Sequence, residues 1–504
     1  MRYIALICPM SAIAVMGQTS WEYTLQETNR LAHITDAVEM NGTVIIGAGS
    51  FDINFQTPDR SQIVWLDETG SQLAIEPLYD LTTTVSITKL LPLPDLDRVH
   101  AFGRYSDNLS SDGNGFFQYE LHPNGLVGGD WLHLFPGMER AQLEDAVIYN
   151  GDHIFLAGVG RVNTQWFNRF MRMRLGIDGA IQDSVIEVLG NGLSLARSAV
   201  RWRGMDWVSL EGGPSYVPGV VKCIAFDSDL SFQEGFPLRN LSGSGSIAPS
   251  DSLLVTSLDL IPLDEDKMFI AGSYGYIEPG GKRAGAMIVD TAGNILNTFL
   301  PRSEYLHDFG MLIQGASELV DGNLYFAMVE NFSTGPPDLY SPQEPSRLHV
   351  YKLDSDLNVL CEHVIDGFVD GMYYLPERIK ATSDGGFLLM GSRKNLNSSQ
   401  PFHGWIRKFG PSDCTVSVNE WERTPISIAF PNPGVDGFTV TMNGPVINNG
   451  SLLLYNGQGQ CISTTRVDNS RVEVSAIELA SGIYHYKIVD RTGRPVSSGR
   501  WIKE

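Results

Sequence analysis

The sequence predicts an all-β fold, a seven-bladed β-propeller followed by a small Ig-like β-sandwich. A hairpin unit recurs seven times, roughly every 51 to 64 residues, which is the signature of a repeat architecture. The 504 residues include 52 glycines and 26 prolines, a composition typical of many tight turns. The composition changes after Val416, which predicts a separate second domain, since single hydrophobic cores rarely grow to the size of this chain.

Each repeat begins with an apolar segment, a tight polar turn and a second apolar run that often ends in glycine. Asn-Gly and Asp-Gly between apolar runs are strong hairpin signals, because both central positions of that turn need a positive φ. The seven turns and the strands that follow them are Asn41-Gly42 with Val44–Ile46, Asp95–Asp97 with Val99–Gly103, Asn150-Gly151 with Ile154–Gly158, Arg203-Gly204 with Trp207–Leu210, Asp264–Asp266 with Met268–Gly272, Asp321–Asn323 with Leu324–Met328, and Asp384–Gly386 with Phe387–Gly391.

A second strand and turn complete each repeat. These segments are Trp65–Gly70, Tyr119–Gly125, Met173–Gly179, Ile224–Leu230, Met287–Gly293, Tyr351–Leu357 and Ile406–Asp413. Two hairpins make a four-stranded sheet that cannot bury both faces alone, and packing the copies around an axis solves this problem. Trp21–Leu25 precede the first repeat and could supply a closing strand to the last blade.

The clearest copy of the repeat runs from Ala381 to Ser392 and contains Asp384-Gly385-Gly386 before an apolar strand. It resembles the loose propeller repeats of many exported Bacteroidetes proteins, and it lacks the Trp-Asp dipeptide of WD40 blades. Other copies are degenerate, since Met328 replaces the glycine that ends the strand and the fourth repeat has no Asp-Gly turn. A six- or eight-bladed propeller, or a solenoid, is therefore an open alternative.

Short segments spaced by about 8–12 residues predict a small sandwich over residues 426–504, after a linker at 417–425. Three motifs stand in it: Phe430-Pro431-Asn432-Pro433 at its start, Leu479-Ala-Ser-Gly-Ile-Tyr484 in its middle, and Gly499-Arg-Trp-Ile-Lys503 at its end. The residues that define these motifs are Pro431, Asn432, Pro433, Gly482, Tyr484, Trp501 and Lys503.

Together these motifs resemble the type A C-terminal sorting domain of the Bacteroidetes type IX secretion system, from Pro425 to Glu504. The resemblance implies recognition by the type IX secretion machinery at the outer membrane, followed in most members by removal of the domain. It also implies a location on the cell surface or outside the cell. An ordinary Ig-like sandwich is the alternative.

Residues 1–17 are predicted to be a signal peptide. Arg2 precedes the apolar segment Ile4–Met16, which has the length of a signal-peptide core and is too short to span a bilayer. Cleavage is expected between Gly17 and Gln18, so that the propeller comprises residues 18–416. No later segment approaches the ~18 uninterrupted apolar residues of a transmembrane helix.

Charge and cysteine content exclude several classes of partner. The formal net charge of −22 argues against nucleic acid and against anionic membrane surfaces. Cys8 leaves with the signal peptide, and the remaining cysteines have no Cys-x-x-Cys spacing, so a zinc site is not expected. We expect isolated buried cysteines, with a Cys361–Cys414 disulfide as the alternative that export would permit.

Known catalytic motifs are absent from the sequence. It contains no His-Glu-x-x-His, no Gly-x-Ser-x-Gly and no P-loop, and its ten histidines are scattered. Three acidic turns could hold calcium, although each stands where a hairpin needs a turn residue and none continues into an EF-hand. These turns are Asp95/Asp97, Asp264/Glu265/Asp266 and Asp354/Asp356. We expect no cofactor, with calcium as the alternative.

The long connections of the repeats are expected to gather on one face of the propeller. Functional residues favour loops on a rigid scaffold, and exposed aromatic rings would suit stacking on a sugar or a peptide. The candidate binding residues are Tyr105, Trp166, Tyr216, Tyr274 and Tyr340, accompanied by Tyr276, Lys282, Arg283, Arg393, Lys394 and Phe402. The alternative is that these rings pack onto the rims of the blades.

These observations predict an exported propeller that binds an unknown glycan or protein ligand, and we favour a role without catalysis. One alternative is a glycan hydrolase or lyase whose acids lie on different blades. A pair of carboxylates about 5–10 Å apart in a central pocket would favour that alternative. The other alternative is a structural surface component, which self-association would favour.

Overall fold

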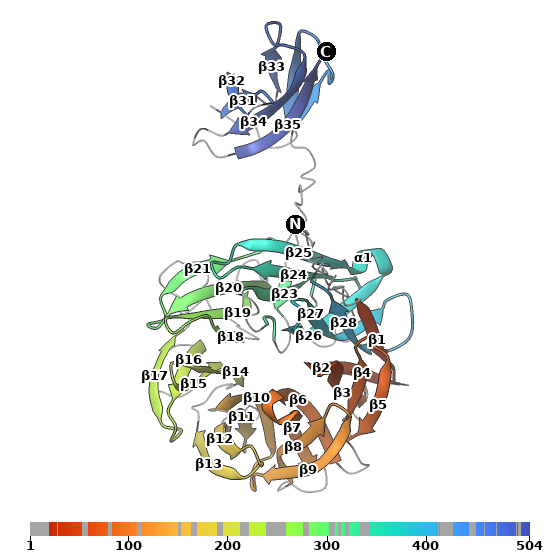
Figure 1. Ribbon diagram of the computed structural model, residues 1–504, viewed down its shortest axis with the longest axis vertical. Helices are drawn as coiled ribbons and strands as arrows, with labels where there is room; N and C mark the ends of the chain where they lie inside the picture. Colours follow the sequence, from red (N-terminus) through yellow and green to blue (C-terminus); the bar gives the residue numbers. More distant parts are fainter. Residues whose placement is uncertain are drawn as a thin grey trace, which may run out of the picture. The chain divides into compact units, whose positions relative to one another are not determined.

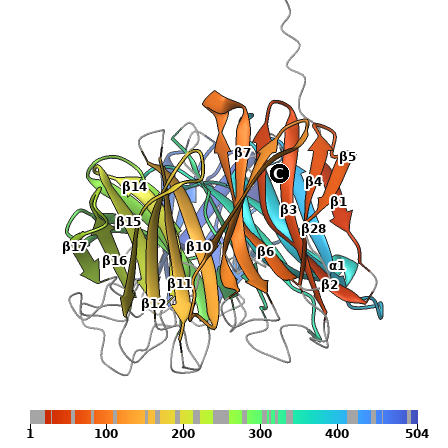
Figure 2. The same ribbon diagram turned by 90° about the horizontal axis from the view of Figure 1, so that it is seen from below.

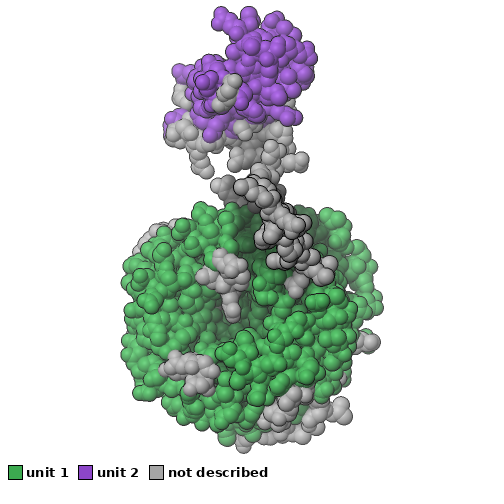
Figure 3. All heavy atoms as spheres, viewed as in Figure 1, with its two compact units in different colours: residues 1–416 green, residues 417–504 purple. Residues whose placement is uncertain are grey.

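The structure is a computed structural model of the chain. The residues it describes are 20–27, 29–52, 59–78, 83–107, 113–149, 153–162, 169–188, 195–211, 221–237, 259–275, 282–301, 308–310, 314–317, 322–332, 342–411, 413, 427–442, 450–457, 459–469, 471–489, 491 and 495–504. The chain divides into two compact units, Met1–Val416 and Ser417–Glu504 (Figure 3). The predicted signal peptide, its Gly17/Gln18 cleavage site and the linker at 417–425 lie outside the described residues.

Seven four-stranded antiparallel sheets form the described part of the first unit and surround a common centre (Figure 1). Blade 1 is β2 (Arg30–Met40), β3 (Thr43–Asp52), β4 (Arg60–Asp67) and β5 (Gln72–Pro77), and blade 2 is β6 (Thr83–Leu93), β7 (Arg98–Asp107), β8 (Asn114–His122) and β9 (Gly125–Leu134). Blade 3 is β10 (Arg140–Tyr149), β11 (His153–Arg161), β12 (Arg169–Gly176) and β13 (Ile181–Val188), and blade 4 is β14 (Leu195–Trp202), β15 (Met205–Glu211), β16 (Val221–Phe226) and β17 (Phe232–Pro237).

The remaining blades follow the same order. Blade 5 is β18 (Asp259–Pro262), β19 (Lys267–Gly275), β20 (Lys282–Asp290) and β21 (Ile295–Phe299), and blade 6 is β22 (Asp308–Gly310), β23 (Leu324–Glu330), β24 (Arg347–Leu353) and β25 (Val359–Asp366). After the short helix α1 (Gly367–Asp370), blade 7 is β26 (Met372–Ala381), β27 (Phe387–Asn395), β28 (His403–Phe409) and β1 (Trp21–Leu25). The prediction of a seven-bladed propeller is confirmed.

The N-terminal strand closes the ring as the sequence predicted. β1 pairs antiparallel with β28, with Trp21 opposite Lys408 and Leu25 opposite Gly404. Blade 7 therefore takes its outermost strand from the beginning of the chain and the other three from the end of the propeller. This pairing covers an edge of β28 that would otherwise expose unpaired backbone groups.

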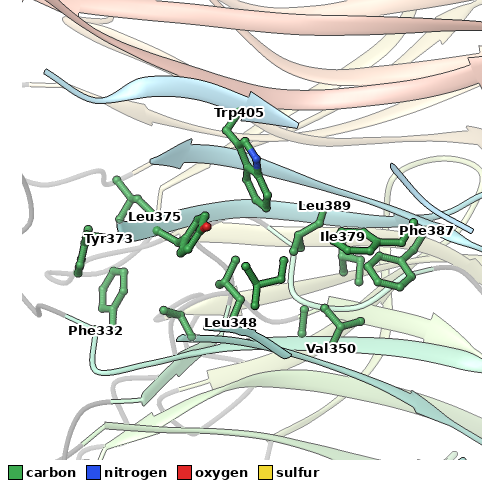
Figure 4. Close-up of a cluster of buried hydrophobic side chains, with 14 of the residues drawn as sticks. Phe332, Leu348, Val350, Tyr373, Leu375, Ile379, Phe387, Leu389 and Trp405 are labelled. Carbon is green, nitrogen blue, oxygen red and sulfur yellow. The ribbon is translucent and has the colours of Figure 1, made fainter. Parts of the chain in front are cut away.

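Hydrophobic side chains are buried between neighbouring blades. Figure 4 shows one such cluster, in which Val350 of blade 6 lies among Ile379, Leu389 and Trp405 of blade 7. All four side chains are buried. Because the apolar face of each sheet is covered by the next sheet, the ring as a whole supplies the burial that one blade lacks.

Aromatic rings on outer strands lock neighbouring blades together. The ring of Trp21, in blade 7, lies over Gly70 in the second turn of blade 1, and Phe236 of blade 4 lies over Gly293 of blade 5 in the same way. Both glycines have a positive φ, and a Cβ atom on either would stand 2.6 Å from the neighbouring ring. Glycine is thus required at each of these turns for two reasons: the backbone has a positive φ, and the ring above leaves no room for a Cβ atom.

The cysteines differ from the sequence expectation. Cys361 is disulfide-bonded to a partner outside the described residues, where Cys414 also lies. Cys223 is a buried free thiol, and Cys461 is a free thiol that is exposed. The expectation of isolated buried cysteines is therefore correct for Cys223 and wrong for the other two described cysteines.

The second unit is a two-sheet sandwich. One sheet has the order β29 (Ser427–Phe430), β30 (Gly437–Met442) and β33 (Arg471–Ser475), and the other has the order β32 (Cys461–Val467), β31 (Gly450–Tyr455), β34 (Gly482–Val489) and β35 (Pro495–Lys503). Phe438 of the first sheet stacks on Trp501 of the second, with ring centroids 4.5 Å apart. The predicted small β-sandwich is confirmed.

Candidate functional site

The first strand of each blade lies nearest the centre of the ring, and the strands run between its two faces (Figures 1 and 2). Five of the described inner strands carry a β-bulge at the same place relative to the next strand. A bulge leaves one residue unpaired and changes the direction of the side chains around it. The residues that the register skips at these bulges are Thr35, Thr88, Glu144, Arg197 and Glu377.

Carboxylates on the inner strands hold neighbouring blades together. Asp36 accepts a hydrogen bond of 2.7 Å from the backbone N–H of Leu90 in blade 2. Asp145 accepts one of 2.8 Å from Ala199 in blade 4, and Asp259 accepts one of 2.9 Å from Ala316. These buried aspartates therefore serve as inter-blade connectors at the centre of the ring.

Two of these aspartates have opposite pKa shifts. Burial raises the pKa of Asp259 to about 7, although the N–H groups of Gly315 and Ala316 oppose the rise. Burial also acts on Asp36, but the charges of Arg378, Lys380 and Lys89 outweigh it and leave the pKa of Asp36 below its ordinary value. Asp36 is thus an anion held by cations, whereas Asp259 lies where its charged form is disfavoured.

Arg378 connects blade 7 to three others. Its side chain is only 2% exposed. Its guanidinium donates to the carbonyl oxygens of Thr35 (3.1 Å) and Thr88 (3.0 Å) and to Oε1 of Gln314 (2.7 Å). Arg378 Nε also lies 3.4 Å from Asp36 Oδ1. One side chain thereby joins blades 1, 2, 6 and 7 around the centre.

A cavity of about 440 Å³ lies toward the ends of the inner strands, on the side of the short first turns. All seven blades contribute to it, through residues 37–39, 89–92, 145–147, 198–201, 260–262, 314, 380–383 and 388. Aliphatic residues such as Val38, Leu91, Val200 and Ile261 make up much of the wall. A mostly apolar cavity of this size with a few polar groups is typical of small-molecule binding sites.

Two lysines are among the charged residues that line this cavity. Lys89 Nζ lies 2.8 Å from Asp145 Oδ1, and Lys380 Nζ lies 2.7 Å from Asp36 Oδ1. Burial lowers the pKa of Lys380, and the charge of Lys89 adds to this effect, while Asp36 opposes it. Each ammonium has three N–H donors, so a bound molecule could accept hydrogen bonds from either lysine without displacing its aspartate.

A smaller cavity of about 180 Å³ lies at the beginning of the inner strands. Two carboxylates line it, Glu144 from blade 3 and Glu377 from blade 7, together with Arg197, Gln142 and His33. Burial raises the pKa of Glu144 to about 7 against the charges of Arg197 and Arg140. Glu377 Oε1 lies 3.4 Å from His33 Nδ1. The two carboxyl groups therefore share a cavity but differ in their surroundings.

The two central cavities do not test the binding role that was predicted for the loop aromatics. Tyr105 is partly buried on β7 and packs against the core between blades 1 and 2. Trp166, Tyr216 and Tyr340 lie outside the described residues, and the side chain of Tyr274 also lies outside them. Phe402 is buried in the core between blades 6 and 7, so it is not an exposed ring. The binding role of these aromatics stays a prediction.

The acidic turns are built by hydrogen bonds from their own backbone. Asp354 Oδ1 accepts from the N–H groups of Asp356 (2.9 Å) and Asn358 (2.8 Å), and Asp264 Oδ1 accepts from Asp266 N–H at 2.7 Å. This is the turn chemistry that the sequence predicted for these residues, with calcium as the alternative. No observation tests calcium binding, which stays a prediction.

The sorting-motif residues meet along the last strand of the second unit. Trp501 Nε1 donates to the Pro431 carbonyl oxygen at 2.8 Å, and Asn432 Oδ1 accepts from the Ile502 N–H at 2.9 Å. Lys503 Nζ donates to the carbonyl oxygens of Ala476 and Ile477. Tyr484 is buried and donates to the Ala480 carbonyl oxygen, whereas Pro433 and Gly482 are exposed. The opening and closing motifs are thus joined by direct contacts.

A charged cluster on blade 6 predicts a pH-dependent stability. His349 Nδ1 lies 2.7 Å from Glu362 Oε1 and its Nε2 lies 3.3 Å from Glu330 Oε2. Burial lowers the pKa of His349, but the hydrogen bonds and charges of the two glutamates outweigh it and raise the pKa to about 9. A raised pKa stabilises the fold below the unfolded value near 6.5, and this contribution is lost as the pH rises through about 9.

The substitution His349→Gln is therefore expected to lower the free energy of unfolding by roughly 2–3 kcal/mol at pH 6 and by much less at pH 9.5. Urea unfolding of both proteins across this pH range measures the difference. His485, which is exposed on the second unit, supplies the control substitution His485→Gln. An equal cost for His349→Gln at both pH values would contradict the assignment of the charge.

Sequence reasoning did not single out the residues at the centre of the ring. Asp36, Lys89, Asp145, Ser198 and Asp259 are polar residues that interrupt the apolar first strand of five successive repeats. Aligning the repeats on their first turns would have placed these residues at equivalent positions. That alignment was the available signal.

Comparison with known proteins identifies the second unit. Residues 428–503 match the secretion system C-terminal sorting domain family. This sorting domain implies interaction with the type IX secretion machinery and indicates export to the cell surface or the extracellular space. No helix in the described residues is long and apolar enough to cross a membrane. No curated protein matches this chain.

Several solved structures are similar to this chain at very low sequence identity. The β-propeller domain of the trilobed protease from Pyrococcus furiosus is 9% identical, with 78% of this chain and 99% of that chain covered and a TM-score of 0.42. The acylaminoacyl peptidase of Pyrococcus horikoshii is 8% identical, with 84% and 59% covered and a TM-score of 0.41, so this chain spans about three fifths of that enzyme. PorZ, a surface component of the type IX secretion system of Porphyromonas gingivalis, is 10% identical, with 94% and 75% covered and a TM-score of 0.19.

Proposed function

We propose that this protein is an exported ligand-binding propeller that takes a small molecule, or the end of a glycan or peptide, into the central cavity of about 440 Å³. The observation that carries the proposal is the composition of this cavity, to which all seven blades contribute. Aliphatic walls give a ligand apolar contact, and Lys89 and Lys380 offer hydrogen bonds that fix its orientation. Export by the sorting domain brings this cavity to ligands outside the cell.

The proposal is tested by screening the full mature chain on glycan and peptide arrays and measuring each hit by calorimetry. Ser383 lines the cavity in the first turn of blade 7, so Ser383→Trp is expected to obstruct it and to weaken binding at least ~10-fold. Ser228 is exposed in the second turn of blade 4, and Ser228→Trp is the matched control. Equal binding by wild type and Ser383→Trp, with both proteins folded, would reject the cavity as the site.

A second candidate function is glycan hydrolysis in the smaller cavity, favoured by Glu144 and Glu377 together. A pair of carboxyl groups with different surroundings is how glycosidases separate a general acid from a base or nucleophile. The pKa of Glu144, raised to about 7, suits a general acid at neutral pH. Turnover of a polysaccharide mixture that disappears in Glu144→Gln, with array binding retained, would favour this function over the first.

A further inference from the structure

Three arginines gather between blades 2 and 3, and none of them is among the residues that line the two central cavities. Arg140 is the first residue of β10 and Arg161 is the last residue of β11, and the two stand directly opposite each other in the antiparallel pair. Arg104 comes from β7 of the neighbouring blade. Like charges directly opposite each other on paired strands are destabilising, so this arrangement has a cost unless a counter-ion offsets it.

The charges of Arg104, Arg140 and Arg161 act on one another. Burial lowers the pKa of Arg104 to about 10, and the positive charges of Arg140 and Arg161 lower it further, with Asp59 alone opposing them. Burial and Arg161 lower the pKa of Arg140 in the same way, against Asp59 and Glu144. A guanidinium seldom has its pKa lowered, which indicates a local excess of positive charge.

Carboxylates of the described residues act on the cluster at different distances. Arg161 Nε lies 3.2 Å from Glu139 Oε2, and both side chains are about one third or more exposed. Asp59 acts on Arg104 and Arg140 from beyond ion-pair distance. Within the described part of the chain, the Arg104 side chain has no ion pair, and its Nε is buried without a hydrogen-bond acceptor. This donor therefore has no acceptor within the described part of the chain.

We propose that Arg104, Arg140 and Arg161 form a binding site for an oxyanion group, a sulfate or phosphate carried by a sugar. Each guanidinium presents its N–H donors in a planar fork that matches two oxygens of such a group. A tetrahedral dianion has enough oxygens to accept from three guanidiniums that approach from two blades, whereas a carboxylate has only two. The site is independent of the central cavity, because none of these arginines lines it.

The placement fits a ligand that reaches the protein from outside. Arg140 and Arg161 lie at the strand ends that lead into the inter-blade link and the long second connection, on the face opposite the short first turns. A chain with a formal net charge of −22 would repel most anions. A group of three arginines is therefore a position at which this chain can bind an anion selectively. Attraction to this cluster is expected to weaken as the salt concentration rises.

The test is calorimetric titration of the full mature chain with glucose 6-sulfate, glucose 6-phosphate and glucose. Wild type is expected to bind the sulfated sugar, the phosphorylated sugar or both, and not to bind glucose. Comparing the two affinities shows whether the site prefers a sulfate or a phosphate group. Arg104→Gln is expected to weaken this binding by ~10-fold or more, the typical worth of a charge-assisted hydrogen bond. Arg203→Gln is the matched control, since Arg203 is exposed, pairs with Glu234 and lies in a short first turn.

Thermal unfolding separates binding from a structural role. Without anion, Arg104→Gln is expected to leave the Tm unchanged or to raise it, because the substitution removes repulsion among the arginines. With the anion, the Tm of wild type is expected to rise, and that of the variant is expected to rise less because its affinity is lower. If Arg104→Gln does not fold, Arg104→Lys keeps the charge without the fork and is expected to bind more weakly than wild type. Equal affinity in wild type and the folded variant, or no binding of either anion by wild type, would overturn the proposal.

Discussion

Replacing Arg378 with methionine is expected to lower the free energy of unfolding of the propeller by about 3–5 kcal/mol. The guanidinium donates to Thr35, Thr88 and Gln314, which belong to three different blades, and it lies beside the buried Asp36 carboxylate. Methionine has a similar length but no donors, so it would leave these acceptors without partners and Asp36 with less compensating charge. Burying unpaired polar groups and an underpaired charge is among the costliest effects of a single substitution.

Equilibrium unfolding in urea, followed by tryptophan fluorescence, measures this loss. Arg378→Lys keeps the charge but loses the planar fork, so it is expected to recover only part of the stability. Arg203→Met serves as the matched control, because Arg203 forms an exposed ion pair with Glu234 and its loss is expected to cost below ~1 kcal/mol. If Arg378→Met unfolds at the same urea concentration as Arg203→Met, the connecting role of Arg378 is wrong.

Removing β1 is expected to have the largest effect on the ring. A chain that begins at Glu27 lacks the backbone pairing with β28 and the buried side chains of Trp21 and Leu25. It also loses the contact of Glu22 with Arg393, at 2.6 Å. Loss of a buried tryptophan side chain alone typically costs 3–5 kcal/mol, a large part of the ~5–15 kcal/mol by which domains are stable. We expect this chain to unfold at much lower urea concentration and to self-associate through the exposed edge of β28.

The matched control is a chain that begins at Ser20 and keeps the whole of β1. Size-exclusion chromatography and urea unfolding compare the two chains. Adding a synthetic peptide of residues 18–27 to the shorter chain is expected to restore part of its stability, because the peptide can pair with β28. A shorter chain that stays monomeric and unfolds at the same urea concentration as the control would show that β1 does not close the ring.

The hairpins of the propeller could be predicted because they depend on neighbouring residues. At Asn41-Gly42 both residues have a positive φ, as the predicted turn requires. At Asp384–Gly386 the Asp384 carboxylate accepts from the Gly386 N–H, and this turn joins β26 to β27 where the repeat predicted a hairpin. The closing strand was predictable for a related reason, since Trp21–Leu25 is a strand-forming segment left over before the first repeat.

The candidate site could not be predicted from the same patterns. Glu144 belongs to blade 3 and Glu377 to blade 7, yet they line one cavity. Arg104 and Arg161 belong to different blades and carry no motif that links them. Their proximity depends on the closure of the ring and on bulges that change the direction of side chains, and neither leaves a local signal.

The sequence by itself determined the class of the fold, the hairpins of each repeat and the sorting domain, while it favoured seven blades over six or eight and offered Trp21–Leu25 as a closing strand. Turn chemistry and strand alternation act over a few residues, so the hairpins of each repeat can be predicted from the residues of that repeat alone. Only the tertiary structure decided which polar side chains meet at the centre and which arginines gather between blades 2 and 3. Those contacts join residues from different repeats, and their distances follow from how seven sheets pack around one axis rather than from any spacing along the chain.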